Sequence, residues 1–119
     1  MAELFPSRRA IIDLASIKEY SIKNWGQQVA QEYLDKFDQA FERLKSSPDI
    51  LHSKRELSGR LLFYRVERHW LVCDIIEDDI YVMMVMHGIM DLPNRIAEIE
   101  PQLLREAEIM YQQILGEME

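Results

Sequence analysis

Cysteine is almost absent from this sequence, since Cys73 is its only example. One cysteine cannot form an intrachain disulfide, and it excludes a zinc site built from several cysteines. Long hydrophobic runs are also missing: no stretch of about eighteen apolar residues occurs, and the first residues lack the basic-then-apolar order of a secretory signal. We therefore expect a cytoplasmic protein without a membrane anchor, held together by its hydrophobic core.

Glycine is scarce and scattered. The four glycines stand at positions 26, 59, 88 and 116, which is too far apart for a loop that cradles phosphate groups. Neither the glycine-rich nucleotide signature nor the version that ends in lysine is present. The sequence therefore gives no support to nucleotide-dependent catalysis, and we expect no cofactor.

Positive charge is in deficit, with 14 basic residues against 21 acidic ones and a net charge of −7. The imbalance is uneven, because seven of the acidic residues but only two of the basic residues follow position 90. The acidic total argues against direct, specific binding of nucleic acid. One stretch is an exception and predicts a locally positive surface; its basic residues are Lys54, Arg55, Arg60, Arg65 and Arg68.

The apolar pattern begins with two helices. The length of 119 residues and a hydrophobic content of 48% suit one globular domain. Apolar residues recur at helical spacing over residues 9–24, and Gly26 follows at a position suited to a helix end. A second stripe over residues 30–44 ends at Ser46, Ser47 and Pro48. The short connection between the stripes predicts an antiparallel helix hairpin.

A sheet is expected downstream of the hairpin. Residues 61–66, 69–76 and 80–87 are rich in β-branched and aromatic side chains and are separated by short polar turns, which predicts an antiparallel meander. Leu4 and Phe5 could add an edge strand, whereas residues 46–59 are expected to form an exposed loop. Met83, Met84, Met86 and Met90 are expected to divide between the two faces of the sheet, because side chains alternate along a strand.

The last part of the chain is helical again. Its apolar residues are spaced by three or four, and the helix is expected to restart at Pro101; they are Ile96, Ile99, Leu103, Ala107, Met110 and Ile114. The predicted fold is thus α+β, with an N-terminal antiparallel helix hairpin packed on a three- to four-stranded antiparallel sheet and an additional C-terminal helix. Residues 1–91 would form the main domain. Residues 92–119 would form an acidic helical extension that packs on it or mediates homo-oligomerisation.

No catalytic or metal site is predicted. Histidine is the first candidate for proton transfer, but His52, His69 and His87 lack the spacing of any known nucleophile pattern. His69 and His87 stand at strand ends, where a histidine commonly makes a structural hydrogen bond. A metal site formed by His69, Asp74 and His87 lacks recognised ligand spacing, and the acidic residues around position 78 suit a solvated turn.

Several short strings resemble the ParE toxins of the ParE/RelE superfamily. They are DLASIKEY at residues 13–20, NWG at 24–26, AQEY at 30–33, FERL at 41–44, GRLLFYRV at 59–66 and MHGIMD at 86–91. Each string is weak alone, but their order and spacing extend over nearly all of residues 13–91. The resemblance implies an α+β fold with a helix hairpin on an antiparallel sheet, and the apolar pattern predicts the same order independently.

The resemblance also implies a function in a bacterial toxin–antitoxin pair. ParE-like members act on DNA gyrase, whereas RelE-like members cleave messenger RNA with basic and aromatic residues, some near the C-terminus. Here only Arg95 and Arg105 stand among the acids that follow the last strand, which favours the gyrase-directed function. Two alternatives remain: an RNA-cleaving toxin that uses Arg60, Arg65, His69 or His87, and a diverged, non-toxic binding module.

The expected partners are a cognate antitoxin and DNA gyrase. The resemblance implies an antitoxin segment that folds across the hairpin and the sheet, and an acidic or amphipathic segment would contact Arg60 and Arg65. The candidate residues for partner binding are Arg60, Tyr64, Arg65, His87, Met90 and Asp91.

Overall fold

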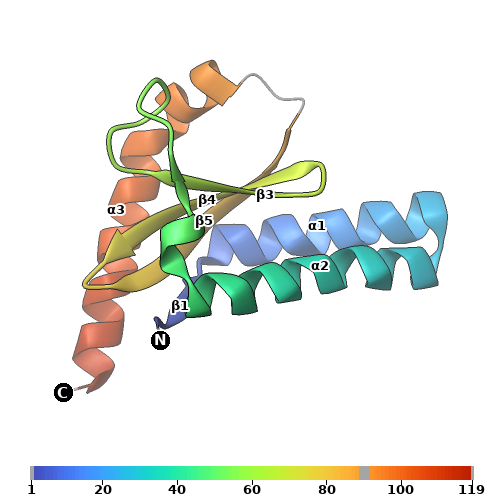
Figure 1. The fold of residues 1–119 in the computed structure, drawn as a ribbon, viewed down its shortest axis with the longest axis horizontal. Helices are drawn as coiled ribbons and strands as arrows, with labels where there is room; N and C mark the ends of the chain where they lie inside the picture. The colour runs from blue at the N-terminus through green and yellow to red at the C-terminus, as the bar shows by residue number, and fades with distance from the viewer. Residues whose placement is uncertain (1, 89–91, 119) are drawn as a thin grey trace.

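The computed structural model describes residues 2–88 and 92–118 (Figure 1). Strand β1 (Leu4–Pro6) is followed by helices α1 (Arg8–Trp25) and α2 (Gln27–Ser46). A single 3-10 turn, η1 (Pro48–Ile50), and strand β2 (His52–Ser53) lead into strands β3 (Leu62–Val66), β4 (His69–Ile76) and β5 (Asp79–His87). Helix α3 (Leu92–Met118) ends the described chain. The predicted α+β class, with its hairpin and its C-terminal helix, is confirmed.

The helix hairpin is defined by its caps. Ser7 caps α1, because its side-chain oxygen accepts a hydrogen bond from the backbone N–H of Ala10. Gly26 ends α1 and precedes α2, and its φ of +90° lies in a region that L side chains rarely adopt. A glycine at this position avoids the strain of a Cβ atom. The hairpin therefore turns where the sequence predicted.

Five strands form the sheet within the described residues, in the order β1-β5-β4-β3-β2. The meander β3-β4-β5 is antiparallel as predicted, but β1 pairs in parallel with β5, with Leu4 opposite Ile80. Strand β2 lies in the segment that was expected to be a loop, and it pairs over only two residues with β3. The edge strand suggested by Leu4 and Phe5 is confirmed. The sheet is mixed and one strand wider than predicted, because β2 is too short to show a period.

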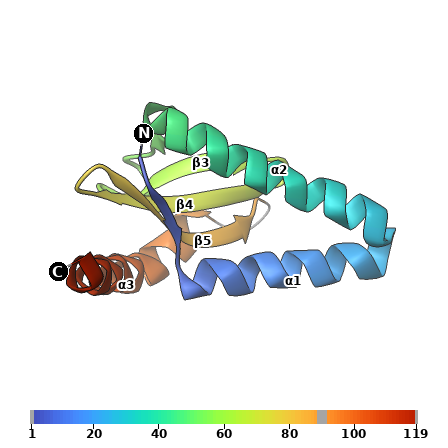
Figure 2. The same cartoon turned by 90° about the horizontal axis from the view of Figure 1, so that it is seen from below.

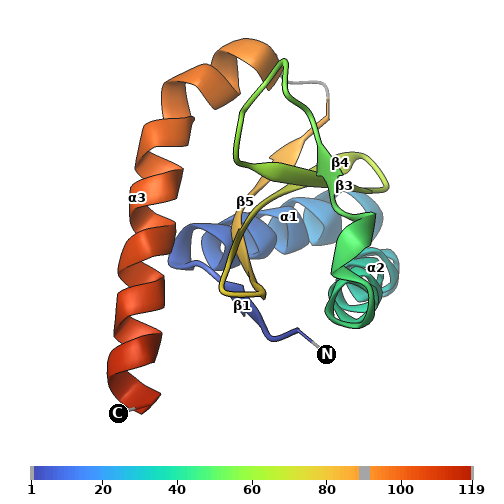
Figure 3. The same cartoon turned by 60° about the vertical axis from the view of Figure 1, so that its left-hand side comes forward.

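The sheet is covered on both faces. Figures 2 and 3 show α1 and α2 on one face and α3 on the other. The hairpin face buries Phe37 and Leu44 against Leu71 and Val82. The opposite face buries Leu103 with a cluster of sheet residues, namely Leu61, Phe63, Val72, Tyr81, Met83, Met84 and Met86. Helix α3 thus covers apolar sheet surface that the hairpin leaves open.

A bulge in β5 changes which side chains share a face. Val72 pairs with Met84 and Cys73 pairs with Val82, so Met83 has no partner on β4. An extra residue in one strand places two successive side chains on the same side. Met83, Met84 and Met86 accordingly belong to the same buried cluster. The expectation that these methionines divide between the faces is wrong, and Met90 lies outside the described residues.

Helix α3 continues through Pro101 instead of restarting there. A proline inside a helix removes one hydrogen bond and bends the helix, and Figure 3 shows the first turns of α3 at an angle to the rest. The predicted apolar stripe is confirmed, since Ile96, Leu103 and Ala107 are fully buried. In the part of the chain that the structure describes, no helix combines the length and apolar character needed to cross a membrane.

Candidate partner-binding groove

A groove of about 620 Å³ lies between the helix hairpin and one end of the sheet. Figure 1 shows why it forms: α1 and α2 extend past the ends of the strands. Residues from α1, α2, β4, β5 and the turn between β3 and β4 line it; they are Ser16, Ile17, Tyr20, Ser21, Trp25, Val29, Tyr33, Arg68, His69 and His87. We call it the hairpin groove.

Two histidines form the sheet side of the hairpin groove. His69 begins β4 and His87 ends β5, and the two are register partners with ring centroids 5.0 Å apart. A hydrogen bond of 2.7 Å joins the Tyr33 hydroxyl to Nδ1 of His69. The Tyr33 hydroxyl oxygen also accepts a long hydrogen bond, 3.4 Å, from the backbone N–H of Arg68. His69 therefore makes the structural hydrogen bond that its strand-end position predicted.

The electrostatics of this cluster keep His69 uncharged. Burial, together with the nearby His87 and Arg65, lowers the pKa of His69 to about 4. Burial also raises the pKa of the Tyr33 hydroxyl above its ordinary value. Near neutral pH both groups are consequently neutral, so they can exchange hydrogen bonds but contribute no charge to the groove.

The wall and rim formed by α1 and α2 have the composition of a protein-binding surface. Tyr20 and Trp25 are exposed and pack edge to face, with ring centroids 5.6 Å apart, and Val29 is exposed beside them. Tyrosine, tryptophan and arginine are the residues that most often dominate binding energy in protein interfaces. Ser21 is 1% exposed, and its hydroxyl has no hydrogen-bond partner in the described chain. A ligand that reaches this wall could satisfy that hydroxyl.

Arg65 approaches the histidines from the other face of the sheet. Its guanidinium carbon lies 5.0 Å from the Trp70 ring centroid, and its Nε donates to the Glu67 carbonyl over 2.7 Å. The same guanidinium packs so closely on Gly88 that a Cβ atom there would come within 2.8 Å of it. Only a glycine at position 88 allows this approach without a shift.

The other predicted contact residues are placed elsewhere. Arg60 pairs with the buried Asp74 at 2.8 Å and approaches Glu108 of α3 at 4.0 Å. The Tyr64 hydroxyl accepts a hydrogen bond of 3.1 Å from Arg43 of α2. Met90 and Asp91 lie outside the described residues. The structure thus brings His87 together with His69 and places Arg65 close by, but it separates Arg60 and Tyr64 from them.

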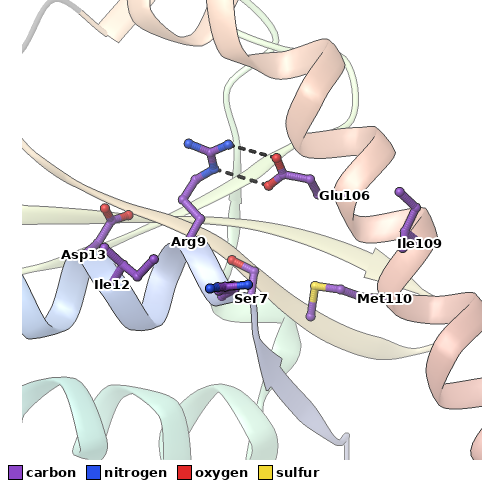
Figure 4. A pocket seen from close by; sticks show the side chains of 8 residues that line it. Ser7, Arg9, Ile12, Asp13, Glu106, Ile109 and Met110 are labelled. Carbon is purple, nitrogen blue, oxygen red and sulfur yellow. Dashed lines mark hydrogen bonds and ion pairs between the residues drawn. The ribbon is translucent and has the colours of Figure 1, made fainter.

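A second groove, of about 510 Å³, lies between α1 and α3 (Figure 4). Arg9 crosses it with two hydrogen bonds, of 2.8 and 3.2 Å, to the Glu106 carboxylate. The contact lowers the pKa of Glu106. Asp13 lies at the α1 side and accepts a hydrogen bond of 2.9 Å from the backbone N–H of Val85. These contacts join α1 to α3 and attach α1 to the sheet, and no feature of the sequence predicted the pairing of Arg9 with Glu106.

The metal site considered from sequence does not assemble. His69 and Asp74 are five residues apart on β4, so their side chains point to opposite faces. Asp74 instead faces Arg60. Across residues 2–88 and 92–118, no three histidine, cysteine or carboxylate side chains lie close enough together to hold a metal ion.

Comparison with known proteins identifies the family. The sequence model described as "ParE toxin of type II toxin-antitoxin system, parDE" matches residues 4–92. The chain belongs to the ParE toxin family. An Escherichia coli protein named Toxin ParE is 29% identical over 87 residues, which cover 72% of this chain and 84% of that toxin. The resemblance of the sequence strings to ParE toxins is confirmed.

A solved structure of a ParDE toxin–antitoxin system has a similar fold. It is titled "Chromosomal ParDE TA system from P. aeruginosa", and it superposes with a TM-score of 0.65 at 13% identity. The match covers 96% of that chain but 73% of this one. The family match ends at residue 92, which is the first residue of α3. Nearly all of α3 therefore lies beyond the residues that the family model matches.

Proposed function

We propose that this ParE family member is the toxin of a toxin–antitoxin pair, that it inhibits DNA gyrase by binding, and that a cognate antitoxin neutralises it. The observation that carries the proposal is the ParE family match over residues 4–92. The hairpin groove supports a binding function, because exposed tyrosine and tryptophan surround it and such residues anchor protein partners. Both partners would be met in the cytoplasm.

We infer that the antitoxin places an acidic or amphipathic segment across the hairpin and the sheet. Arg65 lies close enough to His69 to lower its pKa, and its described contacts are the Glu67 carbonyl, Trp70 and Gly88. A carboxylate of the antitoxin could therefore approach Arg65 without displacing an ion pair. At Arg60 it would have to compete with Asp74. Arg65 is the stronger of the two proposed contacts.

The proposal is tested with purified protein in a DNA supercoiling assay with gyrase. We expect supercoiling to fall as the chain is added, and we expect the product of an adjacent antitoxin reading frame to restore it. Chain that has been unfolded irreversibly by heat is the control. Unchanged supercoiling and DNA cleavage in the presence of the folded chain would count against gyrase as the target.

RNA cleavage is the second candidate, and one observation favours it. The hairpin groove brings Tyr33, His69, His87 and the backbone of Arg68 together, and proton transfer between such groups accelerates cleavage by about 10²- to 10⁴-fold in enzymes that use it. Cationic groups that stabilise developing phosphate charge are also required. Arg65 and Arg68 are the nearest candidates, because Arg60 is held at Asp74.

Ribosome-dependent cleavage of messenger RNA separates the two candidates. The gyrase proposal predicts that the parent chain cleaves no messenger RNA. If cleavage occurs and falls at least about 100-fold in the folded His87→Ala and Arg65→Ala variants, the function is RNA cleavage instead. A chain that neither affects gyrase nor cleaves RNA, and that is harmless on expression, would be a non-toxic binding module.

A further inference from the structure

Helix α1 carries a second apolar stripe on the side that faces away from the sheet. Ala10, Leu14 and Ile17 pack into the hairpin-face core, whereas Ile11 is 54% exposed and Ile12 is 55% exposed. Burial of one large aliphatic side chain is worth about 1.5–3 kcal/mol. Neither Ile11 nor Ile12 contributes that amount to the fold of a single chain.

The exposed stripe continues onto α3 across the α1/α3 groove. Figure 4 shows Ile12 on α1 and Ile109 on α3 as part of the lining of this groove. Ile109 is 52% exposed. Ala15, one turn after Ile11, is also exposed and leaves space beside the isoleucines. This surface, the isoleucine face, therefore has both projecting side chains and a shallow place to receive them.

Two opposite charges flank the isoleucine face on α1. Arg8 precedes Ile11 and Ile12, and Glu19 follows Ala15. Eleven residues correspond to about three helical turns, so Arg8 and Glu19 lie on the same side of α1 and about 16 Å apart along its axis. Neither forms an ion pair with any residue in the described ranges 2–88 and 92–118. Arg9, by contrast, is paired with Glu106.

We propose that the isoleucine face binds the same face of a second copy of this chain, with the two α1 helices antiparallel. A twofold axis between Ile12 and Ala15 places Ile11 and Ile12 of each copy against the small Ala15 of the other. The same axis places Arg8 of each copy beside Glu19 of its partner. The surface is thus complementary to itself in both shape and charge, as an isologous interface requires.

This arrangement leaves most of the hairpin groove accessible, although Ser16, which also lines the groove, borders the isoleucine face. Ile17 and Ser21 line that groove, and they lie on a different side of α1 from Arg8, Ile12 and Glu19, because successive residues rotate by about 100° around a helix. The proposed interface consists of one pair of antiparallel α1 helices with a contribution from Ile109. Its buried area is therefore at the small end of the range for specific protein interfaces. The dimer is accordingly expected to form at high chain concentration.

Charge reversal tests the proposed arrangement. In sedimentation equilibrium, the parent chain should shift from 14.2 kDa toward twice that mass as its concentration rises. Arg8→Glu and Glu19→Arg should each raise the dissociation constant at least about tenfold, because each places like charges together across the interface. An equal mixture of the two variants should dimerise like the parent, since both pairs are then opposite in charge.

The control is Glu32→Arg, an exposed charge reversal on α2, which should dimerise as the parent does. Circular dichroism verifies that all variants are folded. A parent chain that stays monomeric up to roughly 1 mM overturns the proposal and leaves the isoleucine face to a different protein. A mixture that associates no better than the single variants overturns the antiparallel pairing.

Discussion

At the scale of single residues, His69 connects the fold to the hairpin groove. Its ring packs edge to face against Tyr33 and Phe37, and its Nδ1 is hydrogen-bonded to the Tyr33 hydroxyl. Burial of the ring disfavours the charged form, and the nearby His87 and Arg65 add to this effect, so the pKa of His69 falls to about 4. The folded chain therefore favours the neutral form.

This preference for the neutral form predicts a loss of stability in mild acid. The folded-state pKa of His69 is about 4 and its ordinary value is 6.5, so its contribution is fully present above pH 6.5 and is lost as the pH falls toward 4. Allowing for partial solvent screening, the free energy of unfolding should fall by about 1–2 kcal/mol between pH 7 and pH 5 through this residue.

Urea unfolding of the parent and of His69→Gln at both pH values measures this effect. Glutamine can keep a hydrogen bond to Tyr33 but does not titrate. Between pH 7 and pH 5, the free energy of unfolding of the variant should therefore fall by about 1–2 kcal/mol less than that of the parent. The same pH dependence in both proteins would show that another group is responsible.

Arg60 shows where a prediction from sequence reaches its limit at this scale. The sequence places Arg60 in a basic stretch and Asp74 near an acidic turn, and nothing in either pattern reveals that they meet. Asp74 is 1% exposed and pairs with Arg60, while its burial raises its pKa. Likewise, the place of Tyr33 in the apolar stripe over residues 30–44 does not reveal that its hydroxyl reaches His69.

At the scale of elements, α3 is attached to the rest of the chain by core contacts and by ion pairs at its edges. Leu103 and Ala107 are fully buried against the sheet. Glu106 pairs with Arg9 at 2.8 Å, and Glu108 approaches Arg60 at 4.0 Å. These pairs are partly exposed and contribute little stability. The apolar contacts should therefore dominate the attachment of α3.

Substitution of Leu103 tests this balance. Leu103→Ala should lower the free energy of unfolding by about 2–5 kcal/mol, since it leaves a cavity between α3 and the sheet. Leu115→Ala is the matched control, because Leu115 is 38% exposed, and it should cost less than about 1 kcal/mol. Equal costs in urea unfolding would mean that α3 does not depend on Leu103 for its attachment.

Elements with a long apolar period were predictable, and those defined by pairing were not. The hairpin stripes predicted helices at 9–24 and 30–44, close to the observed α1 and α2. Strand β2 has two residues, so it shows no period and exists only through its pairing with β3. The bulge at Met83 depends on how β5 is aligned with β4, and a strand sequence read alone does not contain that alignment.

At the scale of the whole molecule, nearly all of α3 lies beyond the ParE family match, which ends at residue 92. Helix α3 contains much of the acidic excess, but Glu106 and Glu108 face Arg9 and Arg60 of the main body. Two of its acidic residues therefore pair within the chain, which the net charge of −7 alone could not reveal.

The parallel pairing of β1 with β5 affects how the chain folds during its synthesis. Strand β5 lies between β1 and β4 in the sheet, yet it is the last strand to leave the ribosome. Hydrogen bonds such as that from Ser7 to the Met83 carbonyl join residues that are 76 positions apart, and contacts so distant in sequence slow folding. The two helices and β1 emerge first and have no complete sheet to cover until β5 follows. A nascent chain that is interrupted before residue 79 would therefore lack both β5 and His87, and with them part of the sheet side of the hairpin groove.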